Sequence, residues 1–156
     1  MNRDIASAVV AWVERRKQQL SSMLACLFPE QRAAADDPAR LKAFFCTRRA
    51  GKSWCIGILL FTAALMYPGC SCLYMGLTRE TCRAIMNKDI LRVLNDRFGL
   101  GAHWNETQRA WVLPNASVIY LRGADANSYE ISCADARRPP IIEYLLFPEY
   151  PARTSP

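Results

Sequence analysis

The sequence has little of what a metal centre or a membrane segment requires. It contains one histidine, His103, and no two cysteines separated by two residues, so we do not expect a zinc site. Its longest apolar stretch, Trp54 to Tyr67, is interrupted by Gly57 and Thr62 and is shorter than the roughly 20 residues that cross a bilayer as a helix. The sequence therefore predicts no membrane segment.

The chain also lacks a signal-peptide pattern and an even number of cysteines. Its seven cysteines include several that stand within apolar runs. These features favour reduced, buried thiols over a disulfide framework. We therefore expect a cytoplasmic protein.

The remaining composition is that of a globular domain. The 156 residues are 51% hydrophobic and 22% charged, which excludes collagen-like, low-complexity and wholly disordered chains. A chain of about 150 residues can bury a core but has little room for two domains. The net charge is +6, and arginine outnumbers lysine sixteen to four. This surplus permits contact with phosphate groups without requiring it.

The N-terminal residues have apolar positions at helical spacing. They predict an amphipathic helix over residues 5–20, within an N-terminal segment of residues 1–26. Its apolar face has two interpretations, packing against the rest of the chain or docking to a partner protein. A short helical stretch over residues 31–35 follows.

The next segments alternate between strands and helices. The aromatic-rich run Leu41–Cys46 predicts a buried strand, and Lys52–Met66 predicts a buried helix. A second strand is expected at Cys72–Leu77, then a helix over residues 78–95 that its first residue, a threonine, caps. Residues 109–122 predict a β-hairpin. This order indicates an α/β fold with at least two parallel strands.

One pattern is typical of a phosphate-binding loop. The run CTRRAGKS, Cys46 to Ser53, stands between the predicted strand and the buried helix, which is the context that such a loop requires. Gly51 lets the backbone approach a phosphate, Lys52 supplies positive charge to the β and γ phosphates, and Ser53 offers a hydroxyl to Mg²⁺. Backbone N–H groups at the helix start add the positive end of the helix dipole. The alternative is a surface loop before a core helix.

Two features of the loop are unusual. Cys46 stands where such loops have their first glycine, and two arginines precede Gly51. An arginine near the γ phosphate stabilises charge on the transferring group, and Arg48 or Arg49 is placed to do this. The alternatives for these arginines are contact with phosphate or DNA, or simple solvation.

The run LFPEQRAAADDPARLKAFFCTRRAGKSW, residues 27–54, resembles the N-terminal ATPase region of the large terminase subunit of tailed bacteriophages and prophages. That family's loop often replaces the first glycine and has an arginine before GK[ST], as TRRAGKS does here. The resemblance implies that Gln31 reads the adenine edge, and that Arg48 and Lys52 are the catalytic arginine and phosphate lysine. It implies ATP and Mg²⁺ as cofactors, with Ser53 as the metal ligand. The implied nucleotide-binding set is Gln31, Thr47, Arg48, Arg49, Ala50, Gly51, Lys52 and Ser53.

The resemblance covers about residues 27–130. The run LYMGLTRE at residues 73–80 is similar to the family's second strand, and WVLPNASVIYLRGAD at residues 111–125 is similar to its hairpin. The implied fold is α/β, a P-loop NTPase-type three-layer fold with a mainly parallel sheet, incomplete at the C-terminus, in a partial ATPase domain of residues 27–132. The implied function is a DNA-packaging motor in the bacterial host cell. Its partners would be double-stranded DNA, the small terminase subunit, the portal, and further copies in a homo-oligomeric ring.

The sequence departs from this family after Asp125. There the family has a strand of four apolar residues followed by Asp-Glu, and the nearest match, Ile141-Ile142-Glu143, lacks that pair. The family's C-terminal nuclease domain also has no counterpart. Residues 133–156 contain five of the nine prolines and no glycine or lysine. We hypothesise that a frameshift or truncation ended the terminase frame near Ser132; the alternative is a complete small protein with a disordered, proline-rich end.

Two functions of different classes follow. The first is an ATPase, which we expect to be inactive by itself because the Asp-Glu pair is missing. The second is a non-catalytic prophage remnant that binds nucleotide weakly or does not fold stably. A small nucleotide kinase is disfavoured, because the loop lacks its first glycine and no cluster of lid arginines follows.

Overall fold

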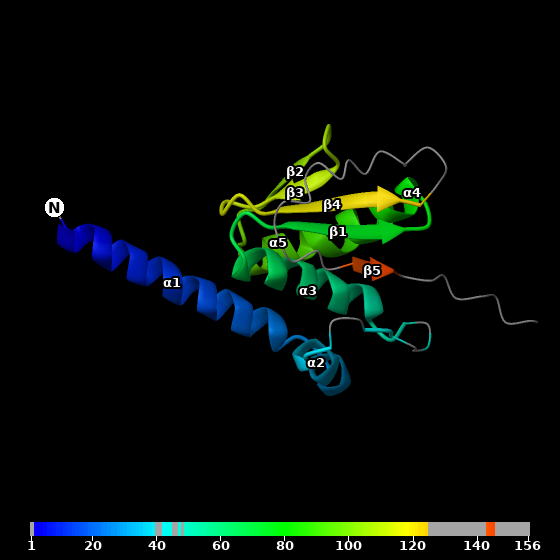
Figure 1. Ribbon diagram of the computed structural model, residues 1–156, viewed down its shortest axis with the longest axis horizontal. Coiled ribbons are helices and arrows are strands. Elements are labelled where there is room, and N and C mark those ends of the chain that lie inside the picture. Colours follow the sequence, from blue (N-terminus) through cyan, green and yellow to red (C-terminus); the bar gives the residue numbers. More distant parts are fainter. Residues whose placement is uncertain (1, 40–41, 45–46, 48, 125–142, 146–156) are drawn as a thin grey trace, which may run out of the picture.

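A computed structural model describes residues 2–39, 42–44, 47, 49–124 and 143–145 of the protein (Figure 1). Within these residues, helices and strands alternate after an N-terminal pair of helices. The helices are α1 (Asn2–Leu24), α2 (Pro29–Asp36), α3 (Lys52–Met66), α4 (Arg79–Thr81), the π-helix η1 (Cys82–Leu91) and α5 (Arg92–Phe98). The strands are β1 (Ser71–Gly76), β2 (His103–Asn105), β3 (Ala110–Val112), β4 (Val118–Gly123) and β5 (Glu143–Leu145).

The strands form an open mixed sheet in the order β2-β3-β4-β1-β5. β1 pairs in parallel with β4 along its whole length, from Ser71 opposite Val118 to Gly76 opposite Gly123. The short β5 pairs in parallel with the other edge of β1. β2 with β3, and β3 with β4, are antiparallel. The α/β class is therefore confirmed.

The prediction of a mainly parallel sheet was wrong. Two of the pairings between the described strands are antiparallel, because a tight turn connects β3 to β4 and a short turn connects β2 to β3. The connection from β1 to β4, which includes η1, α5, β2 and β3, is long enough to return the chain in parallel. The P-loop NTPase-type three-layer architecture stays a prediction.

Two helices cover the same face of the sheet. Phe61 of α3 packs edge-on against the Trp111 ring of β3, with ring centroids 6.4 Å apart. From η1, Asn87 Oδ1 accepts a hydrogen bond of 2.8 Å from Nε1 of the same Trp111. One side chain of β3 thus touches both helices. This face is the buried one, since Ile119 and Leu121 of β4 are also buried on it.

Helix α3 is the centre of the core. Its residues from Cys55 to Leu65 are all buried. Gly57 allows η1 to approach closely, because a Cβ there would lie 2.4 Å from Cγ2 of Ile90 and 3.1 Å from Cδ1 of Leu94. The predicted buried helix over residues 52–66 is confirmed.

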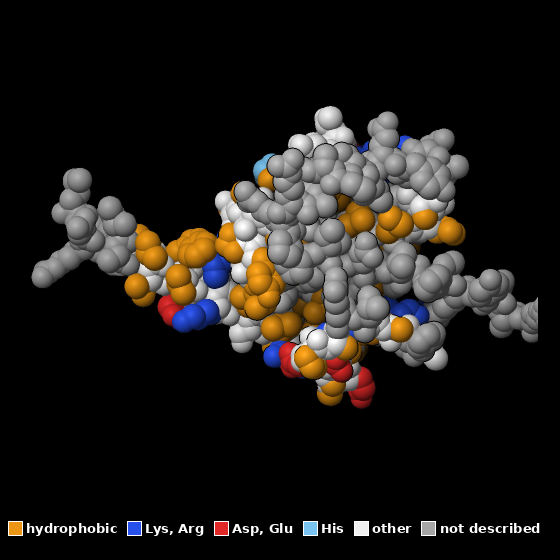
Figure 2. Space-filling view, in the orientation of Figure 1, with side chains coloured by type: hydrophobic (Ala, Val, Ile, Leu, Met, Phe, Trp, Pro, Cys, Tyr) orange, Lys and Arg blue, Asp and Glu red, His pale blue; other side chains and the backbone are white. Residues whose placement is uncertain are grey.

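Helix α1 packs outside this layer along only part of its length. Its C-terminal half contacts α3 and α5, where Met23 is fully buried and Gln19 Nε2 donates to the carbonyls of Phe98 and Gly99. Its N-terminal half extends away from the body of the molecule (Figure 1). There Val10 is 61% exposed and Trp12 50% exposed, and hydrophobic side chains are visible on this part of the surface (Figure 2). The apolar face of α1 thus packs against the rest of the chain only in the C-terminal part of the helix.

The predicted helix over residues 78–95 is confirmed, with an unexpected geometry. Thr78 caps it as predicted, since Thr78 Oγ1 accepts a hydrogen bond from the backbone N–H of Thr81. The middle of the helix is η1, in which, for example, the N–H of Arg92 donates to the carbonyl of Asn87, five residues earlier. Such π-helical geometry is rare and has no sequence signal that we could use.

The predicted strand Leu41–Cys46 is wrong over its described residues. Residues 42–44 belong to no strand, and the rest of the segment lies outside the described residues. Lys42 Nζ donates to the carbonyls of Ala34 and Ala35 at 2.8 and 3.2 Å, so this segment caps the end of α2. Phe44 packs against the core.

The proposed tail, residues 133–156, lies outside the described residues except for β5. The nearest match to the family's acidic strand, Ile141-Ile142-Glu143, therefore contributes only Glu143, the first residue of β5. None of the described helices is both long and apolar enough to span a bilayer.

Candidate nucleotide-binding site

The Gly51-Lys52-Ser53 segment lies near the carboxyl ends of the parallel strands. The arrowheads of β1, β4 and β5 point to the same side of the molecule as the start of α3 (Figure 1). α3 therefore runs opposite to β1, with its N-terminus beside the carboxyl ends of the strands. Open α/β sheets bind their ligands outside these carboxyl ends.

Gly51 is the residue that turns the chain into α3. It occupies the N-cap position in the left-handed region, with φ of 73° and ψ of 17°. Because glycine has no side chain, residue 51 cannot cap the first-turn N–H groups of the helix. These groups carry the positive end of the helix dipole, and α3 is 15 residues long. The start of α3 is therefore suited to an anion.

Lys52 and the preceding loop are in contact. Its Nζ donates to the carbonyl of Thr47 at 3.4 Å, so the side chain reaches back across the loop. The N–H of Ala50 donates to the same carbonyl. The ammonium of Lys52 thus lies next to the carbonyl of Thr47, and its positive charge is near the start of α3.

Gln31 joins helix α2 to this loop. Its Nε2 donates to the carbonyl of Ala50 at 2.9 Å, and its Oε1 accepts from the backbone N–H of Phe28 at 3.2 Å. A Cβ on Gly51 would lie 2.9 Å from Gln31 Nε2. Residues nineteen or more positions apart in the sequence are thereby brought into one site.

The structure places most of the predicted site residues together. Gln31, Ala50 and Gly51 are in direct contact, and the hydrogen bond of Lys52 extends the group to Thr47. For Arg49 and Ser53, the structure gives the backbone position and the exposure. Arg49 is exposed with a left-handed φ of 68°, and Ser53 is half-buried in the first turn of α3. Arg48, the predicted catalytic arginine, lies outside the described residues, as does Cys46.

Phe28 is a residue of this site that was missing from the predicted set. Its side chain is 64% exposed, and its ring lies 3.9 Å from the position of a Cβ on Gly51. An exposed aromatic ring beside a phosphate-type loop is a surface on which a base can stack. The sequence signal for Phe28 was its position three residues before Gln31. That spacing brings both side chains to the same side of α2, next to the loop.

The arrangement offers an anion the uncapped start of α3 and the ammonium of Lys52. It offers few ligands for a metal ion. Ser53 is the one residue of the predicted set proposed for Mg²⁺, and no group of three or more acidic, histidine or cysteine side chains in the described residues is arranged to hold a metal ion. Any Mg²⁺ at this site would therefore be held mainly by phosphate oxygens and water.

The chain was compared with protein-family models, with curated proteins and with solved structures. None of the three comparisons found a match. The function of the site must therefore be argued from the residues that form it.

Proposed function

We propose that this chain binds ATP with Mg²⁺ at residues 47–53, and that it is the ATP-binding part of a viral DNA-packaging motor of the terminase large subunit type. The observation that carries the proposal is the hydrogen bond of 2.9 Å from Gln31 to the carbonyl of Ala50. It joins the stretch that resembles an adenine-recognition segment to the loop that resembles a phosphate-binding loop. The two stretches lie apart in the sequence, so their contact in the fold is what we expect if they form one binding site.

We assign the roles as the family resemblance implies them, with Phe28 added from its place beside Gly51. Lys52 neutralises charge on the β and γ phosphates, and the uncapped first turn of α3 adds its N–H groups. Ser53 supplies a hydroxyl for the magnesium ion that accompanies ATP. Gln31 and Phe28 are next to the loop on the side of α2, where they would contact the base. Arg48 is proposed to stabilise charge on the γ phosphate.

Double-stranded DNA, the small terminase subunit, the portal and a homo-oligomeric ring are proposed as partners from the sequence resemblance alone. The surplus of arginine over lysine is compatible with DNA contact.

A second candidate is nucleotide binding without catalysis. No aspartate is followed directly by glutamate anywhere in the 156 residues. In the family that the sequence resembles, the glutamate of this pair activates the attacking water, and phosphoryl transfer depends on a residue in that position. We therefore propose that these residues bind ATP but hydrolyse it slowly or not at all by themselves.

The test is an equilibrium titration with fluorescent ATP and Mg²⁺. Lys52→Ala removes the charge that faces the phosphates, and we expect it to weaken binding at least tenfold, about 1.4 kcal/mol. Lys88→Ala is the matched control, because Lys88 is exposed on η1 and belongs to no part of the site. Equal affinity of the Lys52→Ala variant and the parent would refute the proposal. Adding double-stranded DNA and measuring phosphate release then separates the ATPase from the non-catalytic binder.

A further inference from the structure

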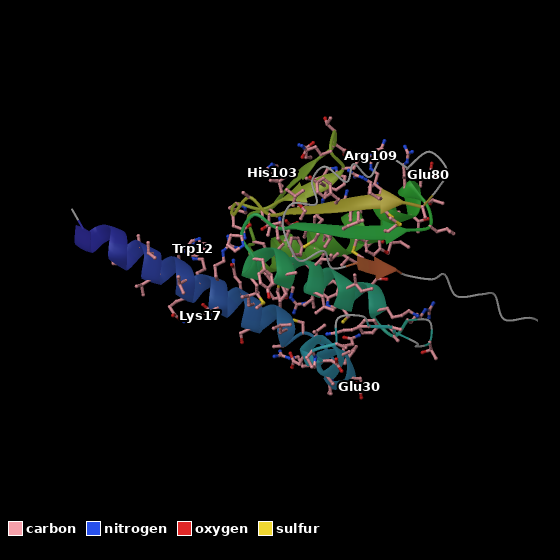
Figure 3. The ribbon with its side chains drawn as sticks, viewed as in Figure 1. Trp12, Lys17, Glu30, Glu80, His103 and Arg109 are labelled. Carbon is pink, nitrogen blue, oxygen red and sulfur yellow. The ribbon has the colours of Figure 1, made fainter. Side chains whose placement is uncertain are left out.

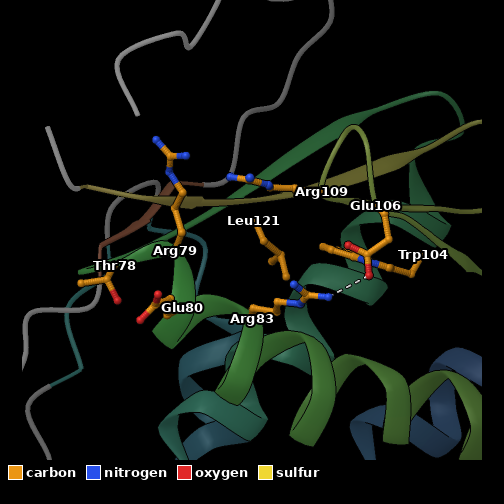
Figure 4. Close-up of a pocket in the computed structure, with 8 residues that line it drawn as sticks. All are labelled: Thr78, Arg79, Glu80, Arg83, Trp104, Glu106, Arg109 and Leu121. Carbon is orange, nitrogen blue, oxygen red and sulfur yellow. Dashed lines mark hydrogen bonds and ion pairs between the residues drawn. The ribbon is translucent and has the colours of Figure 1, made fainter. Parts of the chain in front are cut away.

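A concave site lies away from the loop of residues 47–53. It is a cavity of about 530 Å³ between the helix that follows β1 and the hairpin of β2 and β3 (Figure 4). Its walls include Arg79, Arg83, Arg109, Trp104, Glu106 and Leu121. We call it the arginine cavity. Its volume is in the range of pockets that bind small molecules, about 300 to 1,000 Å³.

The positive charge of the cavity is concentrated on one side. Arg83 Nη2 of η1 and Glu106 Oε1 of the β2–β3 turn form an ion pair of 3.0 Å across the cavity, so the charge of Arg83 is compensated. On the other side lie Arg79, from the helix that follows β1, and Arg109, from the turn between β2 and β3 (Figure 4). Figure 3 shows Arg109 and Glu80 at the same end of the molecule. Outside the pair of Arg83 and Glu106, the lining has two arginines, Arg79 and Arg109, and one carboxylate, Glu80.

A third guanidinium, that of Arg122, lies outside the cavity lining. Arg122, at the end of β4, is held by carbonyls, since its Nη1 donates to Gln108 and Arg109 at 3.0 and 3.4 Å. Burial lowers the pKa of Arg122, the nearby Tyr120 acts in the opposite direction, and the positive charges of Arg109 and Arg79 lower it further. The positive charges of Arg79 and Arg109 thus extend beyond the cavity lining to Arg122. Guanidinium groups in such a position can bind an anion with several oxygens.

The apolar part of the lining narrows the class of anion. Trp104 and Leu121 form part of the wall. Trp104 packs against Trp111 with centroids 6.1 Å apart, and its buried Nε1 has no hydrogen-bond partner among the described residues. Guanidinium groups that bind phosphate, next to an indole that can contact a base, are the combination that proteins use for nucleotides.

We propose that the arginine cavity binds a nucleotide phosphate, carried either by a free nucleotide or by a nucleic-acid strand. Arg79 and Arg109 bind the phosphate, and Trp104 contacts the attached base or sugar. This site shares no residue with residues 47–53, so it does not depend on the function proposed for that loop.

The test uses the full chain with Lys52→Ala, so that the loop contributes little. The probes are a dye-labelled single-stranded 20-nucleotide oligothymidine, AMP, and inorganic phosphate as competitor. We expect Arg79→Gln with Arg109→Gln to weaken binding at least tenfold. We also expect the slope of log affinity against log salt for the oligonucleotide to fall by about 1.4, the value for two lost contacts to single-stranded phosphates. If AMP binding is lost, the source is a free nucleotide; if only the oligonucleotide is affected, it is a nucleic-acid strand.

The matched control is Arg15→Gln with Arg92→Gln, which removes two exposed arginines and the same charge elsewhere. We expect it to change affinity less than threefold. Arg79→Lys with Arg109→Lys keeps the charge and loses the planar fork, so we expect partial loss. Circular dichroism confirms that each variant folds. Equal weakening by the two Gln pairs, an unchanged affinity, or no binding of any probe would overturn the proposal.

Discussion

At the scale of single residues, Gly51 is the position where the candidate site depends most on backbone conformation. Its φ of 73° is one that residues with a Cβ rarely adopt, and a Cβ would also meet Gln31 Nε2 at 2.9 Å. Displacing Gln31 would break its bond to the carbonyl of Ala50. Gly51 thus determines both the turn into α3 and the contact with α2.

We therefore predict that Gly51→Ala destabilises the protein by about 2 to 3 kcal/mol, of which about 1 to 2 is backbone strain and about 1 the lost hydrogen bond. Urea unfolding measures this. Gly99→Ala is the matched control, since Gly99 has a φ of 56° and nothing within 4 Å of its Cβ position. The excess cost at Gly51 should disappear in a Gln31→Ala background. Equal costs at the two glycines would show that the contact with Gln31 is unimportant.

Tyr74 gives a second prediction at this scale. Burial raises the pKa of Tyr74 to about 12, and the neighbouring Cys82 adds an electrostatic contribution in the same direction. The ordinary value is about 10, so the folded protein holds this proton more tightly than the unfolded chain. The free energy of unfolding should then be unaffected below about pH 10 and should fall as the pH rises through about 12.

Urea unfolding at about pH 8 and about pH 11 tests this. Between these values the parent should lose about 1 kcal/mol more than a Tyr74→Phe variant, which has no phenol to titrate. Identical losses in the two proteins would mean that another group causes the alkaline sensitivity.

At the scale of elements, the hydrogen bond between Asn87 and Trp111 connects η1 to the sheet. Both side chains are 3% exposed, and the bond from Trp111 Nε1 to Asn87 Oδ1 is 2.8 Å long. Trp111 also meets Phe61 of α3. The pair therefore helps to hold η1 against the sheet, beside α3.

We predict that Asn87→Leu destabilises the protein by about 1 to 3 kcal/mol, because it leaves a buried indole N–H without an acceptor. Thermal and urea unfolding of a double-mutant cycle with Trp111→Phe measure the coupling. Asn87→Leu should cost less in the Trp111→Phe background, where no N–H is left unpaired. Additive effects would contradict this role of the pair.

Local signals explain which elements were predictable. The helix of residues 52–66, the strand at 72–77, the cap at Thr78 and the hairpin depend on periodicity, capping chemistry and turn residues that neighbouring positions carry. The segment Leu41–Cys46 does not, because a short apolar run is compatible with several structures. Here Lys42 bonds the end of α2 and Phe44 packs on the core, which only the tertiary fold determines.

At the scale of the whole molecule, the arrangement of the sheet could not be predicted. Pairing β1 directly with β4 brings residues about fifty positions apart into register, and no local pattern specifies this. The short β2 was missed for a related reason, since three residues carry too little periodicity. Parallel strands were expected from the order of elements. Instead β3 pairs in antiparallel with both β2 and β4, so half of the described pairings are antiparallel.

The two candidate sites also differ in how far the sequence predicts them. Gly51, Lys52 and Ser53 are consecutive, so their motif is readable in the sequence. Gln31 was linked to them only by the family resemblance, and the structure provides the contact. The arginine cavity had no sequence signal, because Arg79 and Arg109 come from different elements that meet only when the sheet forms.

The central claim is that ATP binds where Gln31, Ala50, Gly51 and Lys52 meet. Nuclear magnetic resonance of the ¹⁵N-labelled chain, titrated with ATP and Mg²⁺, tests it most directly. We predict saturable shifts of the backbone N–H signals of Ala50, Gly51 and Lys52 and of the side-chain amide of Gln31, and their loss in the Lys52→Ala variant. Signals of these four residues that stay unmoved at saturating ATP would contradict the account.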